Sequence, residues 1–71
     1  MKQIVISTAY ITLGQVLKEA GIIDTGGMAK WYLSEHVVYV NGEEVNLRGK
    51  KLRPGDIVKA ADGTEIEIAA K

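Results

Sequence analysis

The chain has no cysteine, only one proline and one histidine among its 71 residues, and no excess of charge of either sign. Without cysteine there is no disulfide, no thiolate nucleophile and no cysteine-based zinc or iron–sulfur site, so a small core must be stable through packing alone. No apolar run approaches the roughly 18 residues of a membrane-spanning helix, and the N-terminal run is too short for a signal peptide. We therefore expect a cytoplasmic protein with no membrane partner.

The balance of charges points away from a nucleic-acid partner when it is taken alone. The chain has nine basic and nine acidic residues, so its formal net charge is zero. Nucleic-acid-binding domains, in contrast, usually carry a basic excess. With 46% hydrophobic and 25% charged residues, the composition is that of a folded globular protein. At this length we expect a single domain over residues 1–71. The position of the charges then matters more than their sum.

The sequence contains few residues that could carry out catalysis. His36 is the one imidazole, and its place at the end of an expected helix suits a cation that compensates the helix dipole. The acidic residues are scattered or alternate toward solvent, as Glu65 and Glu67 do, which gives no cluster of metal ligands. We expect no enzyme, no catalytic or metal-binding residue, no cofactor and no small-molecule substrate.

Local patterns predict two helices followed by strands. Thr12 and Gln15 have the spacing of a capping box at the start of a helix over 13–20, and Gly21 can end it in the left-handed conformation. Asn41-Gly42 is a strong hairpin signal behind a β-branched run. The remaining expected elements are a strand over 3–6, a helix over 28–35, and strands over 37–40, around 44–45, over 56–60 and over 64–69. The order predicts an α+β domain with two helices on one face of a small, mainly antiparallel sheet.

The expected second helix has a core face and an outward face. At about 100° per residue, Ala29, Tyr32 and Leu33 share the side that packs, whereas Lys30 and Trp31 point outward. Trp31 either offers a stacking plane to an exposed nucleotide or is covered by the N-terminal strand or a partner protein. The sequence leaves both interpretations open.

The basic residues are concentrated in two short places. Arg48, Lys50, Lys51 and Arg53 fall within six positions that contain no acid, and Lys30 lies on the outward face of the second helix. Salt screening acts over roughly 8–10 Å, so a phosphate backbone can meet such a cluster although the whole chain is neutral. The alternative is a basic loop that only keeps the surface soluble. The Gly26-Gly27 pair, Lys30 and Trp31 favour RNA, since they supply amides, charge and a stacking plane.

Three stretches within residues 12–58 resemble the S-four (S4) RNA-binding domain, named after small-subunit ribosomal protein four. They are Gly27-Met28-Ala29-Lys30-Trp31-Tyr32-Leu33, Val38-Tyr39-Val40-Asn41-Gly42-Glu43-Glu44-Val45 and Leu52-Arg53-Pro54-Gly55-Asp56-Ile57-Val58. The chain looks most like the short stand-alone bacterial members called YaaA-like. The resemblance implies the two-helix, alpha-L arrangement on an antiparallel sheet, completed here by N- and C-terminal strands.

The resemblance also implies where RNA lies, namely along the second helix and the loop before the Pro-Gly-Asp turn. Carried over by position, it selects Thr25 to Gly27, Lys30, Arg48, Lys50 and Lys51. The charge pattern adds Arg53, and the outward helix face adds Trp31. The expected RNA-binding residues are therefore Thr25, Gly26, Gly27, Lys30, Trp31, Arg48, Lys50, Lys51 and Arg53.

The leading hypothesis is a non-enzymatic, ribosome-associated module for structured RNA, either ribosomal or transfer RNA, which also contacts a ribosomal or other protein. A protein-binding adaptor anchored on Trp31 is the main alternative. A β-grasp carrier fits less well, because such carriers end in Gly-Gly and this chain ends Ala69-Ala70-Lys71.

Overall fold

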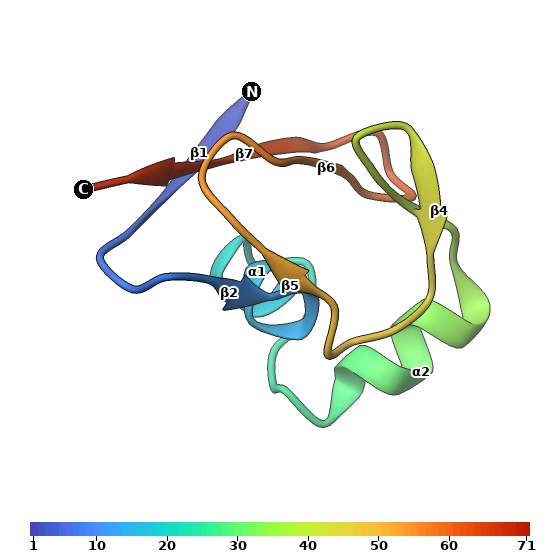
Figure 1. The fold of residues 1–71 in the computed structure, drawn as a ribbon. Helices are drawn as coiled ribbons and strands as arrows, with labels where there is room; N and C mark the ends of the chain where they lie inside the picture. Colours follow the sequence, from blue (N-terminus) through green and yellow to red (C-terminus); the bar gives the residue numbers. More distant parts are fainter.

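The computed structural model describes residues 1–71 as two layers, a sheet above and two helices below (Figure 1). The helices are α1 (Leu13–Glu19) and α2 (Met28–Glu35), each within a residue of the predicted bounds. The strands are β1 (Lys2–Ile6), β2 (Ile11–Thr12), β3 (Val38–Val40), β4 (Glu43–Val45), β5 (Lys51–Leu52), β6 (Ile57–Lys59) and β7 (Glu65–Ala70). The predicted α+β class is confirmed.

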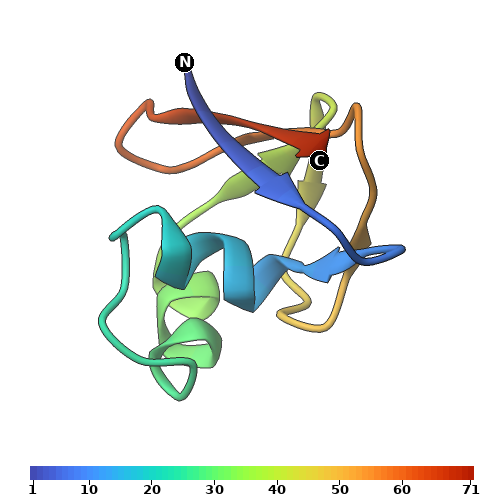
Figure 2. The same cartoon turned by 90° about the vertical axis from the view of Figure 1, so that its left-hand side faces the viewer.

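The main sheet has five strands in the order β1-β7-β6-β3-β4. All neighbouring pairs are antiparallel except β1 and β7, which join the two ends of the chain in parallel. Both helices lie on one face of this sheet, and the other face is left uncovered (Figure 2). The prediction of a mainly antiparallel sheet with helices on one face is therefore correct.

A second, two-stranded sheet was not predicted. Strands β2 and β5 pair antiparallel, with Ile11 opposite Leu52 and Thr12 opposite Lys51. The sequence predicts connections for both segments, because two-residue strands are too short to show an alternating pattern. This small sheet ties the chain after Asn46 to the start of α1.

Local signals fix both ends of α1. The backbone N–H and the hydroxyl of Thr12 donate to Gln15 Oε1 at 3.1 and 3.0 Å, so the glutamine reaches back to the cap as predicted. At the other end Gly21 has φ 77°, and the N–H of Ile22 donates to the Leu17 carbonyl at 3.0 Å. The left-handed glycine thus turns the chain out of the helix.

The core lies between the helix layer and the sheet. The predicted inner face of α2 is confirmed, since Ala29, Tyr32 and Leu33 are all buried. The side chains that are fully enclosed come from α1 and from strands β3, β5, β6 and β7: Leu13, Leu17, Leu52, Ile66, Ile68, Val16, Val38 and Val58. Neither helix is long and apolar enough to cross a membrane.

Asn41 and Asp56 link the two turns at one end of the sheet. Asn41 Nδ2 donates to Asp56 Oδ1 at 3.0 Å, and the Arg53 N–H donates to Asp56 Oδ2 at 2.8 Å. The pKa of Asp56 lies below its ordinary value, chiefly because of the Arg53 N–H and then the Asn41 amide, against a smaller opposing effect of burial. Lys50 and Arg53 lower it further by their charge.

Replacing this carboxylate gives a testable pH dependence. Because the folded-state pKa of Asp56 is depressed, its stabilisation is present above the ordinary value of 3.8 and is lost as the pH falls through the folded pKa. We expect Asp56→Asn to lower the free energy of unfolding near neutral pH, and the difference from the native chain to shrink in acid. Urea titrations between about pH 6 and about pH 2 measure it. A difference that stays constant over this range would contradict the assignment.

Candidate nucleic-acid interface

The basic loop, residues 46–53, is held against the first turn of α1. The N–H of Leu13 donates to the Lys50 carbonyl and the N–H of Gly14 to the Arg48 carbonyl, both at 2.9 Å. The loop itself is closed by the N–H of Lys50, which donates to the Leu47 carbonyl at 3.1 Å. The first amides of a helix have no partner within that helix, so α1 fixes the loop backbone while the basic side chains stay exposed.

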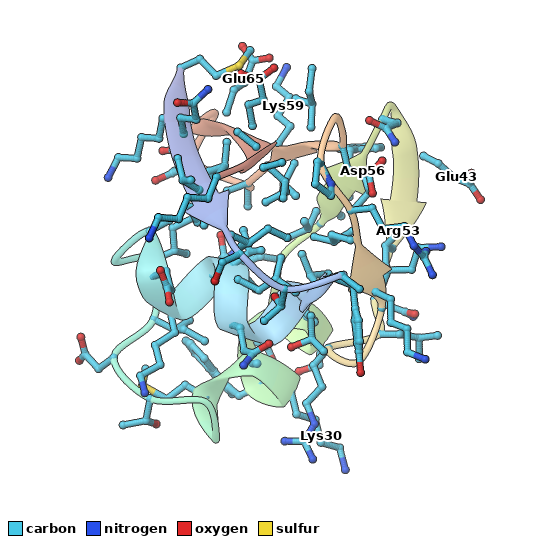
Figure 3. All side chains as sticks on the ribbon, turned by 60° about the vertical axis from the view of Figure 1, so that its left-hand side comes forward. Lys30, Glu43, Arg53, Asp56, Lys59 and Glu65 are labelled. Atoms are coloured by element: carbon cyan, nitrogen blue, oxygen red, sulfur yellow. The ribbon has the colours of Figure 1, made fainter.

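Gly14 brings this loop close to the second helix. A Cβ atom at Gly14 would lie 3.3 Å from the Cβ of Ala29 and 3.4 Å from the carbonyl oxygen of Arg48. A side chain here would be tightly packed against both neighbours, so glycine favours the close approach of α1, α2 and the loop at this point. Lys30, next to Ala29, is exposed at the end of the helix layer farthest from the sheet (Figure 3). Lys30 and Arg48 therefore lie on either side of the point near Gly14 where α1, α2 and the basic loop meet. We call this point the junction.

The start of α2 presents backbone groups to solvent. The carbonyls of Thr25 and Gly26 accept the N–H groups of Met28 and Ala29 at 3.1 and 3.2 Å. The N–H groups of Gly26 and Gly27 have no backbone or side-chain acceptor in the protein, and all three predicted residues of this turn are exposed. The amides that remain free for a phosphate are thus those of the two glycines.

Trp31 is exposed, which excludes one of the alternatives that the sequence leaves open. Its side chain keeps 55% of its accessible surface, so the N-terminal strand does not cover it. The ring meets the His36 imidazole edge-on, with centroids 6.0 Å apart. His36 follows the last residue of α2, as predicted, and its ring lies 4.7 Å from that of Tyr32. More than half of the surface of Trp31 therefore remains accessible.

The other basic side chains have a different neighbourhood. Lys51 Nζ lies 4.9 Å from the centre of the Tyr10 ring, a cation–π distance. Lys50 and Arg53 line a hollow of about 200 Å³ together with the acidic Glu43 and Asp56. The predicted basic residues thus form two groups. Lys30 lies on α2 with Arg48 beside it, whereas the positive charge of Lys50, Lys51 and Arg53 is partly balanced by the carboxylates of Glu43 and Asp56. The charge count along the sequence did not reveal this balance.

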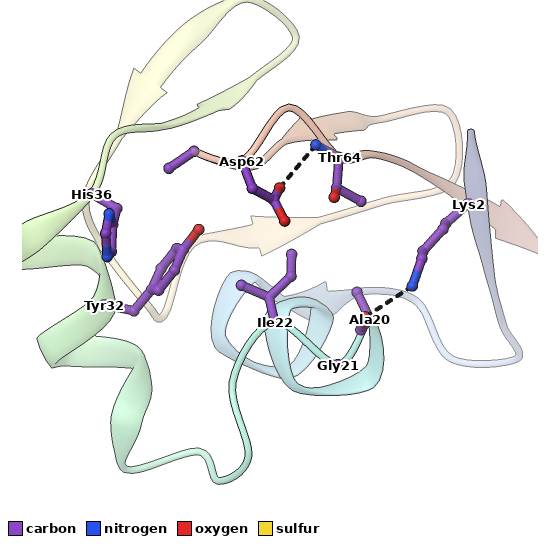
Figure 4. A pocket seen from close by; sticks show the side chains of 9 residues that line it. Lys2, Ala20, Gly21, Ile22, Tyr32, His36, Asp62 and Thr64 are labelled. Atoms are coloured by element: carbon purple, nitrogen blue, oxygen red, sulfur yellow. Dashed lines mark hydrogen bonds between the residues drawn. The ribbon is translucent and has the colours of Figure 1, made fainter.

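The largest hollow of the molecule involves none of the predicted site residues. It has a volume of about 490 Å³ and lies between the helix layer and the turn from β6 to β7, lined by residues that include Lys2, Tyr32, His36 and Asp62 (Figure 4). Its two charged groups are engaged in the fold: Lys2 Nζ donates to the Ala20 carbonyl at 3.1 Å, and Asp62 accepts the Thr64 N–H at 2.9 Å. The structure contains no group of three or more side chains that could hold a metal ion.

Comparison with known proteins identifies the family. A model of the S4 domain matches residues 4–69. The chain belongs to the S4 domain family. A relative from Bacillus subtilis (strain 168), described as a probable ribosome maturation protein RlbA, is 61% identical over 54 residues, which are 76% of each chain. The predicted S4 resemblance is thus confirmed, and the S4 match extends beyond residues 12–58 into strands β1 and β7.

Proposed function

We propose that this S4 protein is a non-enzymatic RNA-binding module that acts in the cytoplasm on structured ribosomal RNA. The whole of residues 1–71 forms the binding unit, with residues 12–58 as its core. The observation that carries the proposal is the junction at Gly14, where the start of α1 holds the basic loop beside α2. The relative described as a ribosome maturation protein supports a role on ribosomal particles rather than on transfer RNA.

Phosphate and shape contacts fit this surface better than base reading. The proposed contacts are lysine and arginine side chains and two glycine amides, and these groups recognise the sugar–phosphate backbone. Lys30, Arg48 and the amides of Gly26 and Gly27 form the primary contact. Lys50, Lys51 and Arg53 extend it along the loop, with weaker individual effects where Glu43 and Asp56 lie beside them. A neutral chain with such a local cluster binds RNA without the indiscriminate affinity of a strongly basic protein.

Trp31 supplies the one contact to a base. Stacking of a base on an aromatic ring contributes about 1–3 kcal/mol, so Trp31→Ala is expected to weaken RNA binding by roughly 5- to 160-fold. The loss of stability should be small, because the ring is half exposed. Since Trp31 is the only tryptophan, its fluorescence reports contact directly. Saturating ribosomal RNA that leaves the emission unchanged would remove Trp31 from the interface.

The proposal is tested by ultraviolet crosslinking in cells, followed by sequencing of the attached RNA. Ribosomal RNA should be recovered at defined positions from the native protein and at much lower yield from the Lys30→Glu/Arg48→Glu variant, which reverses both charges of the primary contact. Circular dichroism of the purified variant checks that the charge reversal leaves the fold intact. If no RNA is enriched over this variant, the RNA-binding role is wrong and the adaptor hypothesis takes its place.

A further inference from the structure

The face of the five-stranded sheet opposite the helices is open and partly apolar. No element covers it in either view of the ribbon (Figures 1 and 2). Val37 and Tyr39 keep 45% and 41% of their accessible surface, and Val5 keeps 54%. We refer to the side chains of Val37, Tyr39, Glu44, Ile57, Lys59, Glu65 and Glu67 as the outer sheet face. Exposed apolar side chains interrupted by charges are a feature of protein contact sites.

Two hollows flank the centre of the outer sheet face. One has a volume of about 440 Å³ and the other of about 210 Å³, and Tyr39 and Lys59 line both. Ile57 contributes apolar surface to the larger hollow, and Val37 to the smaller. Tyr39 and Lys59 therefore form a ridge between the two hollows, each of which is large enough for a side chain.

The charge on this face is negative. Glu44 lies opposite Tyr39 in the register of β3 and β4, and Lys59 lies opposite Glu65 in that of β6 and β7. Glu67, opposite Ile57, accepts a hydrogen bond from Gln3 Nε2 at 3.2 Å. Lys59 is thus the one basic residue among three glutamates, and its cross-strand partner is one of them. A polyanion such as RNA is disfavoured here, and a positively charged ligand is favoured.

We propose that the outer sheet face binds an extended protein segment that carries both apolar and basic side chains. Alternate side chains of an extended chain project to the same side about 6–7 Å apart, so apolar side chains can enter the two hollows while lysines or arginines reach Glu44 and Glu67. Lys59 and Glu65 lie at the opposite end of the molecule from Lys30 (Figure 3). The segment and an RNA can therefore be bound at the same time.

Site-specific photocrosslinking in cells tests this inference. The chain is made with p-benzoylphenylalanine in place of Tyr39, and crosslinked peptides are sequenced by mass spectrometry. We expect recurrent peptides in which apolar residues alternate with lysine or arginine, and a fall in yield of at least roughly fivefold when Glu44→Lys and Glu67→Lys are added. The matched control is Glu19→Lys/Asp24→Lys, which makes the same change in net charge at exposed positions on the helix side and should leave the yield unchanged.

Four outcomes would overturn the inference. These are the absence of a crosslinked peptide, crosslinking of Tyr39 to RNA, crosslinking to a second copy of this chain, and an equal loss of yield in the two charge variants. This experiment detects a protein segment, whereas the ultraviolet experiment detects RNA. If the RNA-binding proposal alone is wrong, the native chain gives no RNA crosslinks but still gives the peptide crosslinks at position 39.

Discussion

Replacing Lys30 and Arg48 together by glutamate is expected to weaken the binding of ribosomal RNA by roughly a hundredfold or more at physiological salt. A hydrogen bond to a charged group contributes about 1.5 kcal/mol or more, which is about a factor of ten in affinity for each phosphate that is no longer bound. The two side chains flank the junction where Gly14 approaches both Ala29 and the Arg48 carbonyl. Their reversal therefore removes two phosphate-binding groups and also places repulsive charges at the centre of the proposed interface.

The control for this variant is Lys18→Glu/Lys59→Glu, which changes the net charge equally. Lys18 lies in the last turn of α1, away from the helix start that holds the basic loop, and Lys59 lies on the outer sheet face. Titration of labelled ribosomal RNA should show at most about a threefold loss for the control, because its charges act only through the screened field of the whole molecule. Equal losses for both variants would mean that RNA responds to net charge and not to this surface.

Leu52→Ala is expected to have the largest effect on stability of any substitution in or beside the basic loop. Leu52 is fully buried and pairs with Ile11 across the small β2–β5 sheet. Truncating a buried leucine costs about 2–5 kcal/mol, whereas a domain of this size has about 4–10 kcal/mol of stability in total. The variant should be close to unfolding, and its basic loop should lose its fixed position.

Leu47→Ala makes the same chemical change at the other end of the loop and serves as the control. Leu47 keeps 67% of its accessible surface, so its truncation should change the free energy of unfolding by no more than about 0.5 kcal/mol. Urea denaturation followed by far-ultraviolet circular dichroism measures both variants. A similar, small loss in the two would show that Leu52 does not anchor the loop to the core.

The helices and most strands could be predicted because their signals are local. The contact between Thr12 and Gln15, the left-handed Gly21 and the Asn41-Gly42 turn are each encoded within a few neighbouring residues. The inner face of α2 follows from the helical period, which the burial of Tyr32 and Leu33 confirms.

Pairings between distant segments could not be predicted. Strand β1 pairs with β7, whose residues lie more than 60 positions later, as Gln3 and Glu67 do, and no local pattern specifies a parallel partner. Strands β2 and β5 are two residues each, and they form because Ile11 and Leu52 are buried together in the tertiary structure.

The candidate site was visible in the sequence only as residue types. The clustering of Arg48 to Arg53 predicts a basic surface, but nothing local indicates that α1 holds this loop through the Lys50 and Arg48 carbonyls. The sequence also does not show that Glu43 and Asp56 lie among the loop cations, nor that Trp31 is exposed. These features depend on which elements pack together.

We propose that the surface around Lys30 and Arg48 binds RNA phosphates. The most direct test of this proposal is the affinity for ribosomal RNA as a function of salt concentration, because each phosphate contact contributes about 0.7–0.9 to the slope of log affinity against log salt. We expect a clear negative slope for the native chain, reduced in magnitude by about 1.4–1.8 in the Lys30→Ala/Arg48→Ala variant, which lacks two of the phosphate contacts. A slope near zero for the native chain, or an unchanged slope in the variant, would show that this surface does not bind RNA phosphates.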